Sequence, residues 1–141
     1  MSHSPFDTSK PLPVADGDSA EFWKALNEGV FLLQHCEDCG DVQYYQQAMC
    51  RICLSENVSR KPSSGKGIIY SYSVVHRAPG PAFKADVPYA VLLVQLDEGP
   101  KMISRLVESD LSLVDFDLPV EWVGVEVAEG VTLPCFRFAK S

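Results

Sequence analysis

No apolar run in these 141 residues approaches the roughly 18–20 residues that a membrane-spanning helix needs. Residues 1–18 contain no apolar stretch between a basic start and a cleavage site, so we expect no signal peptide and a cytoplasmic location. Basic residues are also few, with 12 Lys and Arg against 19 Asp and Glu. The resulting net charge of -7 disfavours nucleic-acid and anionic-membrane partners, because such binders neutralise phosphates with cationic side chains.

Sequence signals for catalysis are equally scarce. The only histidines are His3, His35 and His76, and no glycine-rich phosphate loop or Ser–His–Asp pattern accompanies them. Catalytic groups that are distant in sequence can meet in a folded chain, so an enzyme is not excluded by this absence. We nevertheless expect a non-catalytic protein.

The cysteines are concentrated in one stretch. Four of the five lie within CEDCGDVQYYQQAMCRIC, residues 36–53, as two Cys-x-x-Cys pairs: Cys36 with Cys39, and Cys50 with Cys53. Each pair places two thiolates at adjacent corners of a tetrahedron, and two pairs fill all four positions around a Zn²⁺ ion. Because such a site has no open position for water or substrate, the predicted role of the metal is structural.

The sequence leaves other interpretations of the cysteines open. Iron can replace zinc, since iron sites are also built from four cysteine thiolates. Two disulfides are disfavoured in a cytoplasmic chain, and thioredoxin-like chemistry would need a single pair in an α/β framework. His35 is interpreted as a surface or packing residue, because four cysteines already suffice for a metal. Cys135, far from the cluster in sequence, is interpreted as a buried apolar thiol.

The predicted secondary structure is mainly β. Asp18 as N-cap, Glu21 three residues later and Gly29 as the stop predict one N-terminal helix of about ten residues. Strand-like runs around the cysteines predict the hairpins of a rubredoxin-like zinc ribbon. Five further strands predict a C-terminal five-stranded OB-fold barrel, at 67–76, 88–97, 101–108, 119–129 and 131–139, with a turn or short helix at 109–117. Periodicity alone does not separate this barrel from an SH3-like one.

The composition is that of an ordinary globular chain, with 46% hydrophobic and 22% charged residues. Its length allows one domain or two very small ones. We expect a flexible leader at 1–17, the helix plus zinc ribbon at 18–61, and the OB-fold domain at 62–141.

The ribbon and the residues that follow it resemble the DUF35 family, in which a rubredoxin-like zinc ribbon precedes an OB-fold domain. The resemblance covers about residues 20–139, nearly the whole chain. It rests on short blocks that are specific only in combination: Phe22-Trp23, the four cysteines, Gly65-x-Gly67, Tyr70-Ser71-Tyr72, His76-Arg77-x-Pro79, Pro88-Tyr89, Leu96-Asp97-Glu98-Gly99 and Leu133-Pro134-x-Phe136-Arg137.

The resemblance implies an accessory subunit that binds acyl-CoA and partners a thiolase-fold enzyme, a thiolase or an aldolase, in lipid or sterol side-chain metabolism. A MaoC-type hydratase is a second partner class that it implies. The OB-fold domain would then help to bind the acyl-CoA, while the ribbon and the helix contact the partner. A nucleic-acid-binding or regulatory ribbon–barrel module is the alternative, and an independent acyl-CoA hydrolase or transferase is a further one.

Candidate ligand or partner contacts lie in the second half of the chain. A coenzyme A thioester carries several phosphate charges, so its groove needs cationic side chains beside apolar walls. The loop 77–87 follows the first predicted barrel strand, and OB folds commonly bind ligands there. This loop and its neighbouring strands supply the candidates His76, Arg77, Phe83, Lys84, Lys101 and Arg105. Solvated surface charge is the alternative role of each cation. Tyr70 and Tyr72 are interpreted as part of a half-buried sheet face rather than as a base-stacking platform.

Overall fold

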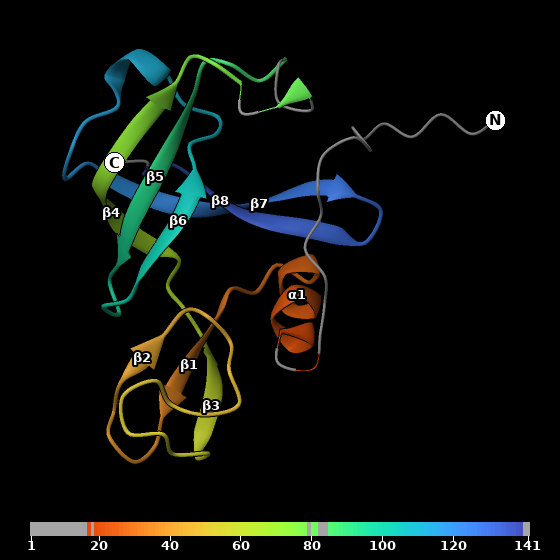
Figure 1. Cartoon of the computed structure of the whole chain (residues 1–141), viewed down its shortest axis with the longest axis vertical. Helices are drawn as coiled ribbons and strands as arrows, with labels where there is room; N and C mark the ends of the chain where they lie inside the picture. Colours follow the sequence, from red (N-terminus) through yellow and green to blue (C-terminus); the bar gives the residue numbers. More distant parts are fainter. Residues whose placement is uncertain (1–16, 18, 79, 82–84, 140–141) are drawn as a thin grey trace.

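The computed structural model describes residues 17, 19–78, 80–81 and 85–139 of the chain. One helix precedes two β-sheets, and the longest axis of the molecule runs from the smaller sheet to the larger one (Figure 1). The elements in chain order are α1 (Ala20–Asn27), β1 (Leu32–Cys36), β2 (Val42–Gln43), β3 (Val58–Pro62), β4 (Lys66–Val75), β5 (Tyr89–Leu96), β6 (Lys101–Arg105), the 3₁₀ helix η2 (Leu111–Leu113), β7 (Pro119–Ala128) and β8 (Val131–Phe138). The predicted fold class, mainly β with one N-terminal helix, is confirmed.

The helix α1 begins one residue later than the sequence predicts. Its N-cap is Ser19 and not Asp18, which lies outside the described residues. Glu21 is therefore too close to the cap to complete a capping box, and its carboxylate instead lies 3.5 Å from the guanidinium of Arg60. The predicted stop at Gly29 is confirmed, because its φ of 83° lies in the left-handed region that glycine adopts readily. No helix among the described residues is long and apolar enough to cross a bilayer.

The larger sheet closes into the predicted barrel. Its strand order is β6-β5-β4-β7-β8, and all neighbouring strands are antiparallel. The two outer strands then meet, since Leu106 forms a parallel bridge with Phe136 and the N–H of Val107 donates to the Phe136 carbonyl at 2.8 Å. The hydroxyl of Ser104 adds a hydrogen bond to the Pro134 carbonyl, 2.7 Å away. This closed five-stranded arrangement is that of an OB-fold.

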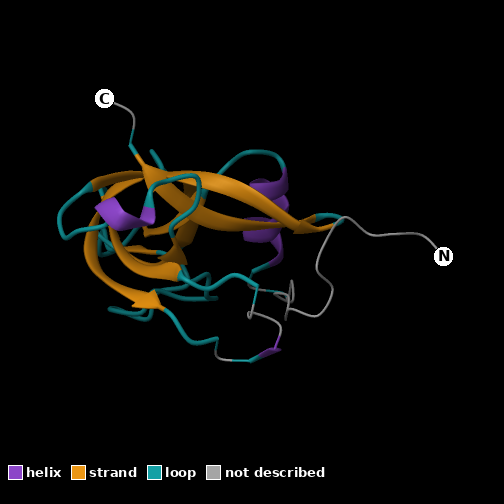
Figure 2. Cartoon of the chain, turned by 90° about the horizontal axis from the view of Figure 1, so that it is seen from above, coloured by secondary structure: helices purple, strands orange, loops and turns teal. Residues whose placement is uncertain are grey.

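The smaller sheet and the helix lie at one end of the barrel. The order β2-β1-β3 places β1 in the centre of the ribbon sheet. The hairpin of β7 and β8 extends past the barrel and packs against α1, as the view from above shows (Figure 2). At its tip the side-chain amide of Asn27 donates to the carbonyl of Gly130 at 2.7 Å. The helix therefore contacts both the ribbon and the barrel.

One hydrophobic core joins the helix, the ribbon and the barrel. The ring of Phe22 on α1 lies edge-on to Phe31, with centroids 6.0 Å apart, and Phe31 lies 5.5 Å from the ring of Trp122 on β7. Alternate residues of β5 line the barrel side of this core: Ala90, Leu92, Val94 and Leu96. Because the rings come from separate parts of the chain, their burial stabilises those parts together.

Only residues 63–65 separate the last ribbon strand, β3, from the first barrel strand, β4. Gly65 has a φ of 73°, and a Cβ there would lie 1.9 Å from Cδ1 of Trp122, so no larger residue fits. The N–H of Trp122 donates to the Gly65 carbonyl at 2.7 Å, and the N–H of Ser64 donates to the Glu98 carboxylate at 2.9 Å. These contacts thus fix the conformation of residues 63–65, through which the chain passes from the smaller sheet to the larger one.

Candidate functional site

The four paired cysteines converge on one point of the ribbon. Their sulfur atoms all lie within 4.8 Å of one another, with the Sγ atoms of Cys36 and Cys53 3.6 Å apart and those of Cys39 and Cys50 3.5 Å apart. A tetrahedral zinc ion with Zn–S bonds of about 2.3 Å requires S···S separations of roughly 3.8 Å. The four thiols therefore fit one Zn²⁺ ion and fill its coordination sphere.

The backbone of the ribbon directs N–H groups at two of these sulfur atoms. The N–H of Cys39 donates to Cys36 Sγ, and the N–H of Ile52 donates to Cys50 Sγ, both at 3.4 Å. Backbone amides of Cys53 and Ile52 directed at the sulfur lower the pKa of Cys50 to about 7. Because the thiolate is the metal ligand, this arrangement reduces the free-energy cost of deprotonating Cys50 on metal binding. The pKa values of Cys39 and Cys53 are instead raised, with hydrogen bonds from neighbouring thiols among the causes.

Two buried glutamines, which the sequence analysis did not identify, hold the loop between the cysteine pairs. Gln43 Nε2 donates to Gln34 Oε1 at 2.7 Å, and the same oxygen accepts from the N–H of Gln47 at 2.9 Å. Gln43 Oε1 accepts from the N–H of Arg51 at 3.0 Å. Gln34 and Gln43 are direct cross-strand partners on β1 and β2. The pair can therefore be identified only once the register of these two strands is known. Their amides position the second pair relative to the first.

Cys135 and His35 lie outside the metal cluster, as predicted. The thiol of Cys135 is buried on β8, which confirms its interpretation as an apolar core residue, and burial raises its pKa to about 11. His35 is a half-buried residue of β1, opposite Val42 on β2 and Ser59 on β3.

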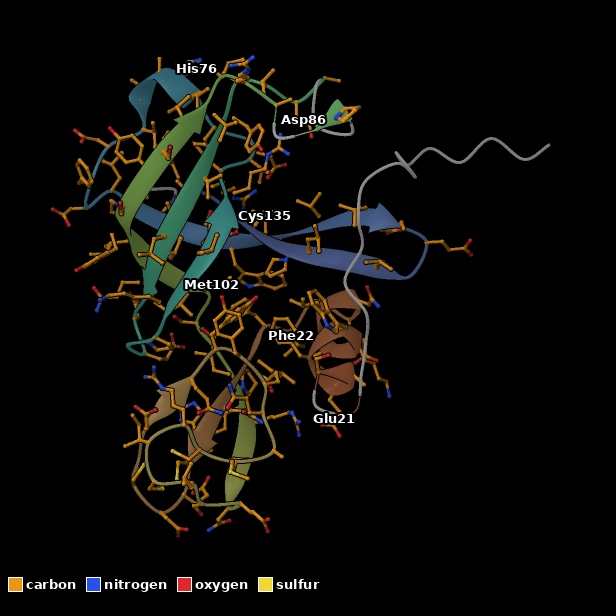
Figure 3. All side chains as sticks on the ribbon, viewed as in Figure 1. Glu21, Phe22, His76, Asp86, Met102 and Cys135 are labelled. Atoms are coloured by element: carbon orange, nitrogen blue, oxygen red, sulfur yellow. The ribbon has the colours of Figure 1, made fainter. Side chains whose placement is uncertain are left out.

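His76 and Arg77 line an open hollow at the end of the barrel that is remote from the ribbon. The hollow has a volume of about 560 Å³, and the other described residues that line it are Ala78, Gly80, Pro81 and Val87. Figure 3 places His76 and Asp86 at this end. Two further candidates, Phe83 and Lys84, lie outside the described residues.

Arg105 and Lys101 lie at opposite ends of β6 and have different neighbours. The guanidinium of Arg105 lies 3.1 Å from the carboxylate of Asp86 and 4.4 Å from the ring centroid of Tyr89. The ammonium of Lys101 lies 4.0 Å from the ring centroid of Tyr70. The structure therefore links Arg105 to the loop 77–87 through Asp86, but separates Lys101 from Arg105 by about 13 Å along the strand.

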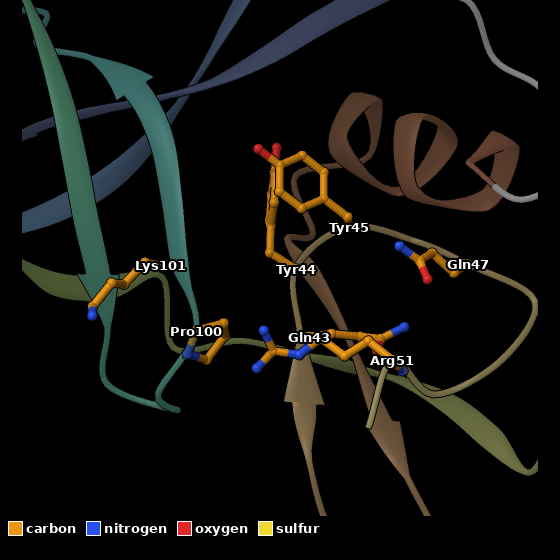
Figure 4. A pocket seen from close by; sticks show the side chains of 7 residues that line it. All are labelled: Gln43, Tyr44, Tyr45, Gln47, Arg51, Pro100 and Lys101. Atoms are coloured by element: carbon orange, nitrogen blue, oxygen red, sulfur yellow. The ribbon is translucent and has the colours of Figure 1, made fainter. Parts of the chain in front are cut away.

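Lys101 instead borders a cleft between the ribbon and the barrel (Figure 4). The cleft has a volume of about 110 Å³ and is lined by Gln43, Tyr44, Tyr45, Gln47, Arg51, Pro100 and Lys101. Arg51 also pairs with Asp41 at 3.0 Å. Sequence reasoning selected Lys101 but missed Arg51, because the fold alone brings the ribbon beside the turn between β5 and β6.

The tyrosines of β4 face different directions. A register shift between Ile69 and Ser71 leaves Tyr70 exposed on the outer surface. Tyr72 packs against the core, and its ring lies 5.0 Å from that of Phe116. The two rings thus do not share one stacking platform, which agrees with their interpretation as part of a half-buried sheet.

Two family matches cover most of the chain. Residues 23–59 match the ChsH2 rubredoxin-like zinc ribbon domain, and residues 60–125 match the ChsH2 C-terminal OB-fold domain. The chain is 31% identical over 128 residues to a probable enoyl-CoA hydratase alpha subunit of Thermomonospora curvata, in a match that covers 91% of this chain and 40% of that protein. The chain thus spans less than half of that relative.

Other similarities extend over whole chains. A DUF35 domain-containing scaffold protein of Pyrococcus furiosus is 30% identical over 134 residues, which cover 92% of this chain and 93% of that protein. The solved structure of an Ltp2-ChsH2(DUF35) aldolase is similar with a TM-score of 0.79 and 31% identity, over 91% of this chain and 99% of that one. The four-cysteine ribbon, the five-stranded barrel and these matches agree, and the chain belongs to the DUF35 family.

Proposed function

We propose that this chain is an accessory, non-catalytic subunit of an acyl-CoA enzyme in lipid or sterol side-chain metabolism. Its partner would be a thiolase-fold enzyme or a MaoC-type hydratase. The observation that carries the proposal is the similarity to the DUF35 chain of the aldolase structure, which extends over 99% of that chain. A relative named as a hydratase alpha subunit supports the same class of role.

The metal centre in this proposal is structural. Cys36, Cys39, Cys50 and Cys53 would hold Zn²⁺, which cross-links the small three-stranded sheet. A saturated Cys₄ site offers no position for substrate, so the ribbon would serve as a structural element and supply no catalytic group. The catalytic groups would come from the partner.

The hollow beside His76 and Arg77 is the proposed contact with acyl-CoA. Among the described residues, its remaining lining of Ala78, Gly80, Pro81 and Val87 is apolar or lacks a side chain, and the cation is Arg77. An apolar wall beside a guanidinium suits a ligand that combines phosphates with an alkyl portion. Phe83 and Lys84, which lie outside the described residues, stay candidates for the same ligand on sequence grounds. Arg105 would act indirectly, since its pairing with Asp86 positions the loop.

Lys101 would contribute a second anion contact, separate from the hollow. Its ammonium lies over the ring of Tyr70 and points away from the cleft between ribbon and barrel (Figure 4). The cleft itself is lined by Arg51, which pairs with Asp41, and by the exposed ring of Tyr45. The cleft volume of about 110 Å³ is far too small for a whole coenzyme, which needs several hundred Å³.

The test combines reconstitution with calorimetry. The zinc-loaded chain is purified with the thiolase-fold or hydratase subunit that it binds, and octanoyl-CoA is titrated into the complex. Arg77→Gln should weaken octanoyl-CoA binding roughly tenfold, the effect of losing one charge-assisted contact. The matched control is Lys66→Gln, which removes an exposed cation at the first residue of β4, the strand that ends two residues before Arg77, and should leave the affinity unchanged.

The possible failures are distinct. A complex that forms but binds octanoyl-CoA equally well with Arg77→Gln would reject the proposed ligand surface and retain the subunit role. A chain that forms no complex but binds single-stranded DNA with a steep salt dependence would reject the subunit role in favour of the nucleic-acid alternative. Hydrolysis of acyl-CoA by the isolated chain would reject the non-catalytic assignment.

A further inference from the structure

The segment between β6 and β7 exposes two large apolar side chains. In this segment, residues 108–118, which we name the acidic loop, Leu113 is 62% exposed and Phe116 is 56% exposed. Their neighbours Leu111 and Val114 instead pack against the core. One isolated exposed apolar residue is normal on a protein surface, but two within four residues form the beginning of a patch.

The acidic loop is anchored at both ends. Near its start, the hydroxyl of Ser109 accepts from the N–H of Phe138 at 3.0 Å. Near its end, the N–H of Asp117 donates to the carbonyl of Ile69 on β4 at 2.7 Å. Held segments lose less conformational entropy on association than free ones do, so the loop is suited to present side chains to another molecule.

The sequence around these side chains carries charge of one sign. Between Arg105 and Arg137 the chain contains no Lys or Arg, and its ionisable carboxylates there are Glu108, Asp110, Asp115, Asp117, Glu121, Glu126 and Glu129. Arg137 pairs with Glu108 at 3.2 Å and with Glu121 at 3.0 Å. Among the described residues, the three aspartates of the acidic loop enter no ion pair. A surface that covers this loop must therefore supply positive charge.

We propose that the acidic loop is a docking surface for a basic patch on a partner protein, with Leu113 and Phe116 entering an apolar pocket of that patch. A second copy of this chain is a poor occupant, because two acidic loops would repel each other. The inference rests on the proposed function as a partner subunit. It adds a contact at the end of the barrel opposite the zinc ribbon (Figure 1).

Calorimetry with the purified partner subunit tests the apolar contact. Leu113→Ser combined with Phe116→Ser should raise the Kd for the partner roughly tenfold or more, as loss of central anchors does. The matched control is Ile103→Ser, because Ile103 is a similarly exposed apolar residue, at 65%, on the outer face of β6. This control should leave the Kd unchanged. Zinc content and circular dichroism verify that each variant folds.

Stopped-flow kinetics test the charge contact. Asp115→Asn combined with Asp117→Asn should slow association and reduce its dependence on salt, since opposite charges accelerate encounter. The matched control is Glu126→Gln combined with Glu129→Gln, which removes two negative charges near the tip of the hairpin of β7 and β8. This control should change neither the association rate nor its dependence on salt.

The outcomes separate this inference from the proposed function. If the wild-type chain forms the complex and the loop variants bind equally well, the inference is wrong and the subunit role stands. Equal weakening by Ile103→Ser would also overturn it, because the effect would not be specific to the loop. If the wild-type chain forms no complex, both fail. If the loop variants abolish self-association in analytical ultracentrifugation, the occupant is a second copy and the proposal is wrong.

Discussion

Gly40 and Leu54 occupy equivalent positions, each one residue after the second cysteine of its pair. Their φ angles are 81° and 62°. The N–H of Gly40 donates to the carbonyl of Cys36, and the N–H of Leu54 donates to the carbonyl of Cys50, both at 3.0 Å. The two halves of the ribbon are thus the same turn used twice, once with glycine and once with a residue that left-handed backbone disfavours.

This equivalence predicts opposite effects of substitution at the two positions. Leu54 is 67% exposed, so Leu54→Gly loses little packing and should raise the free energy of unfolding by up to about 1 kcal/mol. Gly40→Ala should lower it by about 1 kcal/mol. Thermal unfolding at constant zinc and protein concentration measures both. Gly80→Ala, at a position with open space and no positive φ, is the control and should be close to neutral. Shifts of the same sign at Gly40 and Leu54 would contradict the assignment.

The metal site predicts about one zinc ion per chain by elemental analysis. Cys39→Ser should abolish stoichiometric binding and unfold the ribbon, because three thiolates leave the tetrahedron incomplete. Cys135→Ala removes the fifth cysteine and should retain the full zinc content. A red, iron-containing protein with a reversible one-electron couple would show that the site holds iron.

Replacing a buried glutamine by methionine, which has a similar volume, should lower the stability through the lost hydrogen bonds alone. Gln34→Met leaves the donors on Gln43 Nε2 and the Gln47 N–H without their acceptor, so it should lower the free energy of unfolding by about 2–4 kcal/mol. Gln47→Met is the matched control, since only the backbone of that exposed residue is used, and its effect should stay within about 0.5 kcal/mol. Urea denaturation at constant zinc concentration compares them; equal effects would contradict the network.

The buried thiol of Cys135 predicts a defined pH dependence. Its pKa is raised from 9.0 to about 11 by burial, so the unfolded chain loses this proton first as pH rises. The stability that it contributes is therefore complete below pH 9 and is lost between pH 9 and about 11. The difference in thermal midpoint between the wild-type chain and Cys135→Ala should shrink across that range. At pH 8 iodoacetamide should not label Cys135 in the folded chain; rapid labelling there would refute its burial.

The features that the sequence predicts well are those with a local signature. The cysteine pairs, the stop at Gly29 and the five barrel strands depend on spacing or on alternation within a few residues. The pair of Gln34 and Gln43 was missed because its meaning depends on which residues face each other across β1 and β2. The pairing of Arg105 with Asp86 was missed for the same reason, since 19 residues separate the partners.

The three-residue junction between β3 and β4 has a mechanical consequence. The ribbon cannot rotate against the barrel unless the backbone of Gly65 leaves Trp122, and the shared aromatic core opposes that movement as well. The molecule is therefore a rigid spacer along its longest axis. Its length sets the separation between whatever binds the ribbon and whatever binds the far end of the barrel.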